Sequence, residues 1–399
     1  MIDKIVLTKY IIPPKLFWSK FFLLGFFILI GFACSLYMEH EGHYVTGMNN
    51  QIVWGIPHVF AIFLIVAASG ILNIASISSV FGVSIYKPLS RLSGLLAIGL
   101  LVGGLMVLVL DLGRPDRLIV AMTTFNFKSI FAWNIFLYTG FLFIVVIYLW
   151  MMFEGRYNKF VQQVGMFAYA WRIILTTGTG SIFGFLVAKE AYDSAILAPL
   201  FIAMSLLFGT AIFIQAIYYI KTTFDVNTEE IIFKRLKKLM LYFILAVFYF
   251  TILYHLTNLY ATTHHDYEFF LLFEGNIYTY LFWIGQILIG TLLPLYLVSS
   301  KKFYNCWNTL LLSSLLVIIG GFVQLYVIII SGQAFPLDIF PGYIESSSFG
   351  DGEVAKYIPS IYEFMLGFGG IAIALAIFVL GILSLEFIPD SLDDERLQS

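Results

Sequence analysis

Charged residues are scarce in this sequence. Only 12% of the 399 residues are Asp, Glu, Lys or Arg, whereas a soluble domain carries about 25%. Apolar residues make up 60% of the chain, and the mean hydropathy is +0.93. So few charges cannot give every helix a solvated face, which excludes a soluble enzyme. The net charge of −2 offers no basic surface, so we expect no nucleic-acid partner.

Cysteine is equally scarce. Two residues, Cys34 and Cys306, cannot supply the four ligands of an iron–sulfur cluster or a structural zinc site. The sequence also has no CxxCH motif for attaching a c-type haem. We therefore expect no metal site, iron–sulfur cluster or c-type haem in this chain. Any such centres belong on other subunits.

Long apolar runs are what the sequence does contain. Ten runs have the ~18 or more residues that a membrane-crossing helix needs. They fall near 17–38, 55–81, 92–113, 130–153, 161–188, 195–221, 238–260, 277–299, 305–331 and 359–388. We predict an all-α polytopic membrane protein, with residues 1–399 forming a single integral membrane domain.

Lys and Arg are distributed unevenly between the loops. The side that holds both termini receives 16 of them, and the opposite side receives 5. Cytoplasmic loops carry the excess of positive charge, so we expect both termini to be cytoplasmic in a bacterial inner membrane. Residues 38–54, 111–129, 261–276 and 332–358 then face outward. The long segments 261–276 and 332–358 are either solvated connectors or a docking surface for an extracytoplasmic partner.

Polar side chains gather at the outward ends of the predicted spans, where ionisable groups are costly and tend to be functional. The set is His58, Asp111, Trp133, Asn134, Lys189, Glu190, Asp193, His255, Asn258, Gln324, Tyr362 and Glu363. We interpret it as a site for a quinone headgroup, since an imidazole exchanges protons near neutral pH. His58 would exchange a proton with the quinone, and Asp111 would orient the His58 imidazole. Arg114 or Arg117 would keep the Asp111 carboxylate ionised. Alternatively, residues such as Trp133, Tyr362 and Asn258 are ordinary interfacial residues.

A second polar set lies deeper in the predicted spans. Arg172 is near mid-membrane, where a guanidinium needs a partner or water, and Thr176 and Thr179 follow it. With Asn73 and Gln215 they predict a proton path from the cytoplasm, although Ser and Thr in spans often only bond their own helix. No carboxylate accompanies Arg172 at that depth.

Two other functions remain open. A b-type haem needs two facing imidazoles, and only His58 and His255 lie at predicted spans. An absorption spectrum without an α-band would exclude such a cytochrome anchor subunit. In a secondary transporter, Arg172 would bind an anionic substrate beside a broken helix. The segment 177–180, Thr-Gly-Thr-Gly, is the candidate break.

Three segments resemble the NrfD/PsrC family of membrane subunits, of the polysulfide reductase, hydrogenase-2 and alternative complex III type. The third predicted span ends in Asp-Leu-Gly-Arg-Pro at 111–115, Trp54-Gly55 opens the second, and residues 129–133 read Ser-Ile-Phe-Ala-Trp. The segment 45–60 and the length are most similar to the DsrP-like branch. Asn134 departs from the family, because Gly commonly follows that Trp.

The resemblance implies a haem-free subunit that binds menaquinone or ubiquinone. It implies a first four-helix bundle at 55–188 containing the Asp-Leu-Gly-Arg-Pro loop, and a second bundle at 195–331. An outward loop at 332–358 and a last span at 359–388 follow. It further implies an iron–sulfur ferredoxin-like subunit on the outer face, with additional cytochrome or catalytic subunits. Electrons would pass between the quinone pool and that partner in a respiratory or sulfur-metabolism oxidoreductase, with or without proton translocation.

Overall fold

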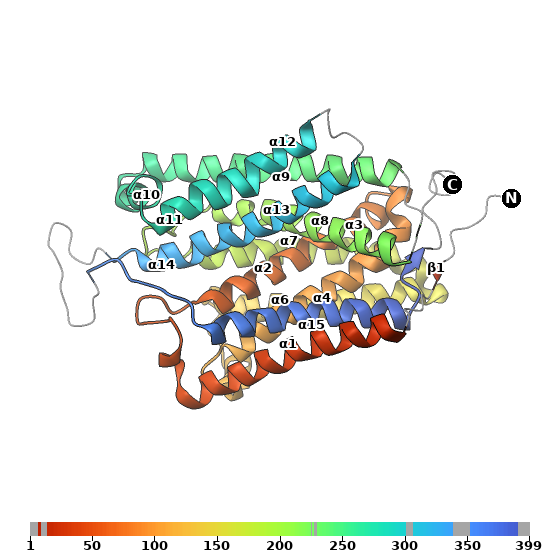
Figure 1. The fold of residues 1–399 in the computed structure, drawn as a ribbon, viewed down its shortest axis with the longest axis horizontal. Coiled ribbons are helices and arrows are strands. Elements are labelled where there is room, and N and C mark those ends of the chain that lie inside the picture. The colour runs from red at the N-terminus through yellow and green to blue at the C-terminus, as the bar shows by residue number, and fades with distance from the viewer. Residues whose placement is uncertain are drawn as a thin grey trace.

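The fold consists of long helices that lie side by side (Figure 1). The computed structural model describes residues 7–8, 14–224, 226, 230–300, 306–337 and 352–389. The long α-helices are α1 (Pro14–Glu41), α2 (Ile56–Ile71), α4 (Ser90–Leu110), α6 (Ile130–Phe153), α7 (Val161–Gly184), α8 (Leu197–Phe224), α9 (Glu230–Tyr260), α13 (Trp307–Tyr326) and α15 (Ile361–Ser384).

Shorter elements connect or extend these helices. The short α-helices are α3 (Asn73–Ser79), α5 (Leu118–Thr123), α10 (His265–Leu272), α11 (Ile277–Tyr280), α12 (Leu293–Ser299) and α14 (Gly332–Ala334). The 3₁₀ turns are η1 (His43–Val45), η2 (Ser84–Leu89), η3 (Pro115–Arg117), η4 (Gly155–Phe160) and η5 (Thr262–His264), and η6 (Leu281–Leu292) and η8 (Val327–Ser331) are π-helical. Strands β1 (Leu7–Thr8) and β2 (Ile388–Pro389) form a minimal antiparallel pair.

The described residues contain nine helical segments that are long and apolar enough to cross a membrane. The other predicted span, 161–188, corresponds to α7, which is 24 residues long, as α6 is, and packs between α6 and α8. It is less apolar, because Gln162, Gln163 and Arg172 lie in it. The predicted all-α fold is confirmed, and the protein is an integral multi-pass membrane protein.

The helices pack in two rings of four. Helices α2, α4, α6 and α7 form one ring, and α8, α9, α13 and the segment η6–α12 form the other. The rings meet where α2 crosses α8 at a pair of glycines. A Cβ on Gly209 would lie 2.2 Å from the backbone nitrogen of Ile71, and one on Gly70 would lie 1.6 Å from the carbonyl oxygen of Ser205. Small residues allow this close packing in the absence of a hydrophobic force between helices.

The segments predicted to face outward meet at one end of the molecule. The ring of His43 contacts the backbone carbonyl of Asp111 at 3.2 Å, and His264 contacts that of Glu190 at 2.6 Å. Figure 1 shows α10, α11 and α14 at this end and β1 at the other. We call these the loop end and the strand end. Helices α1 and α15 lie side by side along one flank of the first ring.

Several local predictions need correction. The predicted break at 177–180 is wrong, because α7 runs through these residues without interruption. The predicted span 55–81 corresponds to one membrane-crossing segment, Ile56–Ser79, in which a turn at Leu72 separates α2 from α3. Segment 261–276 is not a solvated connector, since it forms η5 and α10, in which Tyr267 and Glu268 are buried. Residues 338–351 of the predicted loop 332–358 lie outside the described residues.

Candidate functional site

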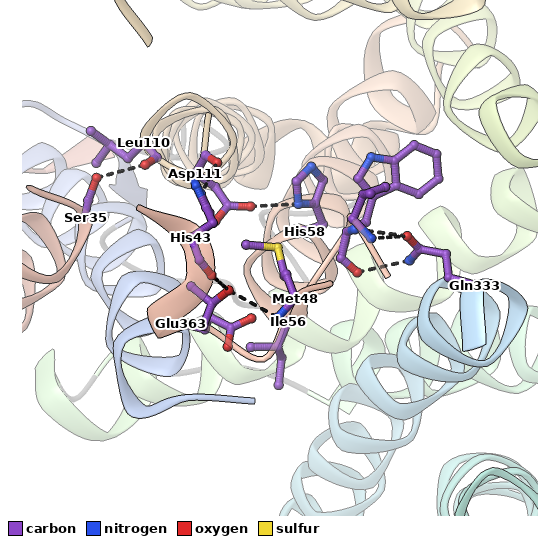
Figure 2. Close-up of polar contacts among 12 residues, drawn as sticks. Ser35, His43, Met48, Ile56, His58, Leu110, Asp111, Gln333 and Glu363 are labelled. Atoms are coloured by element: carbon purple, nitrogen blue, oxygen red, sulfur yellow. Dashed lines mark hydrogen bonds and ion pairs between the residues drawn. The ribbon is translucent and has the colours of Figure 1, made fainter. Parts of the chain in front are cut away.

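His58 and Asp111 meet at the loop end of the first ring. His58 is in the first turn of α2, and Asp111 follows the last residue of α4. The Nδ1 atom of His58 lies 2.8 Å from Oδ2 of Asp111, whose side chain is 1% exposed (Figure 2). The approach is an ion pair by distance, but it lacks the alignment of a good hydrogen bond: Nδ1 and both carboxylate oxygens have no hydrogen-bond partner among the described residues. A carboxylate that faces one ring nitrogen of an imidazole in this way orients the ring.

An apolar cavity of about 270 Å³ lies against the His58 ring. Aromatic and aliphatic side chains from α2, α4, α6 and α7 form its walls, and Leu118 of α5 and Ile329 of η8 complete them. The Trp54 ring stands 6.2 Å from the His58 ring and 5.8 Å from that of Phe183, centroid to centroid. Few polar groups in a mostly apolar pocket are typical of a site that orients an apolar ligand with a polar headgroup.

Asn134 and Tyr138 bring further polar groups to the cavity. The Nδ2 atom of Asn134 donates to the carbonyls of Ile130 (2.9 Å) and Gly178 (3.0 Å), while its buried Oδ1 has no partner in the described part of the chain. Tyr138 lies 3.0 Å from the hydroxyl of Thr179. Sequence reasoning selected Asn134 but missed Tyr138, although four-residue spacing places both on one face of α6.

Gln333 lies in α14, at the loop end of the second ring, and its side chain holds the backbone that precedes α2. Its Oε1 accepts from the backbone N–H groups of Val53 (3.0 Å) and Trp54 (2.9 Å), and its Nε2 donates to the Trp54 carbonyl (3.0 Å). Figure 2 shows the amide facing this backbone segment. Gln333 therefore positions the Trp54 side of the cavity. Nothing in the sequence marks it, because it is a single amide in a connecting segment.

Three predicted site residues stand outside the cavity. Arg114 pairs with Asp116 at 3.1 Å rather than with Asp111, and both side chains are more than half exposed. The Arg114 hydrogen bond lowers the pKa of Asp116. Arg117 is exposed. Trp133 is 47% exposed, and its indole N–H donates to the Phe127 carbonyl at 2.8 Å. The expected contact of Arg114 or Arg117 with Asp111 is therefore wrong.

His255 belongs to a separate polar cluster in the second ring. Its Nδ1 lies 2.8 Å from Oε2 of Glu268, and the Nδ2 of Asn258 donates to Oε1 of Glu268 at 2.9 Å. His58 and His255 thus each face a carboxylate within their own ring, rather than each other as the ligands of one haem would. Sequence reasoning missed Glu268, because it assigned α10 to a loop.

The contacts of Glu363 hold loop segments together at the start of α15. Glu363 is fully buried and accepts from the Tyr357 hydroxyl (2.6 Å), the Gly47 N–H (2.9 Å) and the Ser360 N–H (2.7 Å). Ser360 and Glu363 also form the capping box of α15. Burial raises the pKa of the Tyr357 hydroxyl, and the neighbouring Glu363 carboxylate raises it further. All these partners belong to loops, and Glu363 does not line the cavity.

The deeper polar residues follow one face of α7. The Nη2 atom of Arg172 donates to Oδ1 of Asn73 at 3.0 Å, and the guanidinium stands 4.7 Å from the Tyr169 ring. Its Nε and Nη1 have no partner among the described residues. Thr176 contacts the Ser69 hydroxyl at 2.6 Å. Thr179, further along the same face, contacts Tyr138 at the cavity.

Gln215 does not belong to that face. It lies between α8 and α13, where its Nε2 donates to the Leu311 carbonyl at 3.1 Å and to the Ser314 hydroxyl at 2.9 Å. The structure therefore brings together Asn73, Arg172, Thr176 and Thr179 from the predicted path. It places Gln215 at a different helix interface.

Fold and site together define a class. This is a multi-pass membrane protein with a buried imidazole–carboxylate pair that opens onto an apolar cavity near one membrane surface. The family model for polysulphide reductase, NrfD, matches residues 44–337. The chain belongs to the NrfD family.

Relatives extend the similarity along nearly the whole chain. An Hdr-like menaquinol oxidoreductase integral membrane subunit of Archaeoglobus fulgidus is 28% identical over 359 residues, covering 89% of this chain and 90% of the relative. One selenate reductase subunit, from Mesobacillus selenatarsenatis, is 23% identical, covering 90% and 91%. A putative dimethyl sulfoxide reductase membrane subunit of Halobacterium salinarum is also 23% identical, covering 90% and 89%.

Proposed function

We propose that this chain is the quinol-exchanging membrane subunit of a multisubunit oxidoreductase. It passes electrons between the membrane quinone pool and an iron–sulfur partner. The observation that carries the proposal is the buried pair of His58 and Asp111 against an apolar cavity. The name of the Archaeoglobus relative supports it and favours menaquinone, because that protein is described as part of a menaquinol oxidoreductase.

The residues around the cavity fit a quinone headgroup. A quinol supplies two electrons and two protons on oxidation. With Nδ1–H facing Asp111, His58 accepts a proton at Nε2, and the carboxylate stabilises the resulting imidazolium. The unpartnered Oδ1 of Asn134 accepts a hydrogen bond from the second quinol hydroxyl, whose proton leaves to water at the loop end. The aromatic wall of Trp54 and Phe183 gives the ring an apolar surface.

Electron transfer requires an acceptor outside this chain, because two cysteines cannot bind a cluster. We place an iron–sulfur ferredoxin-like subunit at the loop end, over η3 and α5, whose Leu118 lines the cavity. That end faces away from the cytoplasm, according to the distribution of Lys and Arg. Further catalytic or cytochrome subunits complete the assembly, as the oxidoreductase names of the relatives suggest.

A proton path along α7 accompanies this site in our proposal. Residues 172, 176 and 179 recur at helical spacing, so their polar groups form one stripe from mid-membrane to Tyr138 at the cavity. The unpartnered Nε and Nη1 of Arg172 support water within the stripe, because a buried N–H without a partner is costly. Asn73 extends the stripe towards the strand end.

Substitution of the paired residues tests the quinol site. His58→Ala and Asp111→Asn should each lower quinol-linked turnover of the assembled complex by roughly 10²-fold or more, because each removes proton transfer. The partner subunit should still co-purify with both variants. His255→Ala is the matched control, because His255 faces a carboxylate in the same way but does not line the cavity. Wild-type turnover in both His58→Ala and Asp111→Asn would refute the proposal.

A further inference from the structure

A second cavity, of about 510 Å³, lies at the strand end of the first ring. The end of α3, the turn after it, η2 and the first residues of α4 form one side. The last turns of α6, together with η4 and the start of α7, form the other. The proposed quinol site is at the opposite end of the same helices, so this cavity has a separate role.

The polar groups of the second cavity are those that bind anions. Two cations, Lys87 and Arg91, line it together with Ser84, Ser90 and Asn158, and none of its described lining residues is acidic. Lys87 is exposed, and no ion pair or hydrogen bond involves its side chain in the described part of the chain. An exposed ammonium beside hydroxyl groups is a point-charge site for phosphate.

Arg91 is fixed in the cavity wall by hydrogen bonds to neutral backbone carbonyls. Its Nη2 donates to the Met152 carbonyl at 2.7 Å and its Nη1 to the Glu386 carbonyl at 3.2 Å, while the guanidinium stands 4.3 Å from the Phe153 ring. These partners are neutral. The exposed Glu386 carboxylate acts on Arg91 electrostatically, although the two form no ion pair in the structure as described. Burying an arginine against carbonyls leaves a positive wall.

Two helices direct their positive ends into the same space. Helix α4 begins at Ser90 and α7 at Val161, with 21 and 24 residues, and both residues line the cavity. The backbone N–H groups of Ser90 and Val161 donate to the carbonyls of Lys87 and Asn158 in the preceding 3₁₀ turns, so these helix starts contribute the partial positive charge of the helix dipole, which favours phosphate. The cations, hydroxyl groups and helix ends therefore act together on one ligand class.

The level of the cavity in the membrane indicates where the phosphate comes from. Exposed aromatic residues neighbour the lining residues: Phe81 precedes Gly82, and Tyr157, whose ring centroid lies 5.1 Å from that of Trp150, precedes Asn158. Such rings concentrate at the headgroup level of a bilayer. Basic pockets between helices on the cytoplasmic side bind anionic headgroups.

We propose that this cavity binds the phosphate of an anionic phospholipid in the leaflet at the strand end. The inference does not depend on the quinol site. Binding joins α3, α4, α6 and α7 at the strand end, where the Tyr148 hydroxyl donates to that of Ser79 at 2.6 Å.

The test measures lipid binding by the purified full-length protein in mixed micelles. Phosphatidylglycerol, phosphatidylcholine and inorganic phosphate are the probes, with native mass spectrometry and thermal shift as readouts. Phosphatidylglycerol should bind and stabilise the protein, and phosphatidylcholine should not. Lys87→Gln should weaken the binding of phosphatidylglycerol about fivefold. Ser84→Asp, which adds a carboxylate without removing a contact, should weaken it at least as much.

Lys159→Gln is the matched control, since Lys159 is an exposed cation at the same end that does not line the cavity. Equal binding of both lipids would overturn the proposal, as would equal losses in Lys87→Gln and Lys159→Gln. Full displacement of phosphatidylglycerol by millimolar inorganic phosphate would overturn the lipid assignment and indicate a soluble phosphate ligand.

Discussion

The amide of Gln333 holds the backbone of Trp54 by both its N–H and its carbonyl, at 2.9 and 3.0 Å. Their hydrogen bonds link the loop end of the second ring to the segment that precedes α2. Since Trp54 and His58 line the same cavity, the second ring positions one wall of a site whose ionisable groups belong to the first. A chain of two adjoining bundles therefore has one composite pocket at this end.

Gln333→Leu should consequently weaken quinol binding more than it affects proton transfer. The change leaves the N–H groups of Val53 and Trp54 without their acceptor, a loss of about 1–3 kcal/mol. We expect KM for quinol to rise roughly tenfold, equivalent to ~1.4 kcal/mol, with kcat reduced less. Steady-state kinetics of the assembled complex measure both. Gln215→Leu removes comparable buried hydrogen bonds elsewhere, so an equal KM change in it would show that the effect is nonspecific.

Glu363→Gln should affect stability rather than chemistry. Glu363 accepts three hydrogen bonds that tie Gly47, Tyr357 and Ser360 together. An amide keeps only one oxygen acceptor, so we expect a loss of about 1–3 kcal/mol, seen as a lower midpoint in thermal unfolding. Turnover per folded molecule should stay near wild type. A 10²-fold loss of turnover with an unchanged midpoint would instead place Glu363 in proton exchange.

Composition and apolar runs predicted the all-α membrane fold, because each span must bury its backbone hydrogen bonds within itself. Hydropathy does not report side-chain partners, however. Glu363, His255 and Asp111 look equivalent in sequence, as polar groups at one membrane level. The structure shows that their contacts differ. Glu363 connects loop residues, His255 belongs to a cluster in the second ring, and Asp111 pairs with His58 beside the cavity.

The same limit explains the misassigned arginines. Arg114 follows Asp111 closely, so proximity in sequence predicted an ion pair between them. The chain turns after Asp111 at the end of α4, and Arg114 extends over η3 to reach Asp116. The residue that does reach Asp111 comes from α2. Whether Arg114 or His58 reaches Asp111 depends on helix packing, which proximity in sequence does not specify.

The membrane orientation rests on the uneven distribution of Lys and Arg, and reporter fusions test it. A periplasmic phosphatase fused at residue 120, in α5, should be active, and one fused at residue 230 should be inactive. Residue 120 shares the loop end with His58, whereas residue 230 begins α9 at the opposite end. The reverse pattern would move the proposed quinol site to the cytoplasmic side, and the partner subunit with it.

Arg172→Leu tests the proton path. Arg172 is 1% exposed, its Nη2 donates to Asn73, and no carboxylate pairs with it in the described residues, so its removal also relieves a desolvated charge. A purely structural arginine would therefore tolerate leucine with little loss of stability. If the stripe conducts protons, the variant should keep quinol binding and electron transfer but move fewer protons per electron across sealed vesicles.

A pair of threonines supplies the matched comparison. Thr176→Val removes a hydroxyl that bonds Ser69 within the stripe, whereas Thr210→Val removes a buried hydroxyl on α8 that has no partner in the described residues. The first should lower the number of protons moved per electron, and the second should not. Proton movement and electron transfer are recorded in the same vesicles during steady turnover.

If the wild type moves no protons, or if Arg172→Leu moves as many per electron as the wild type, the path does not exist. Arg172 is then a packing residue between α7 and α3, held by Asn73 and the ring of Tyr169.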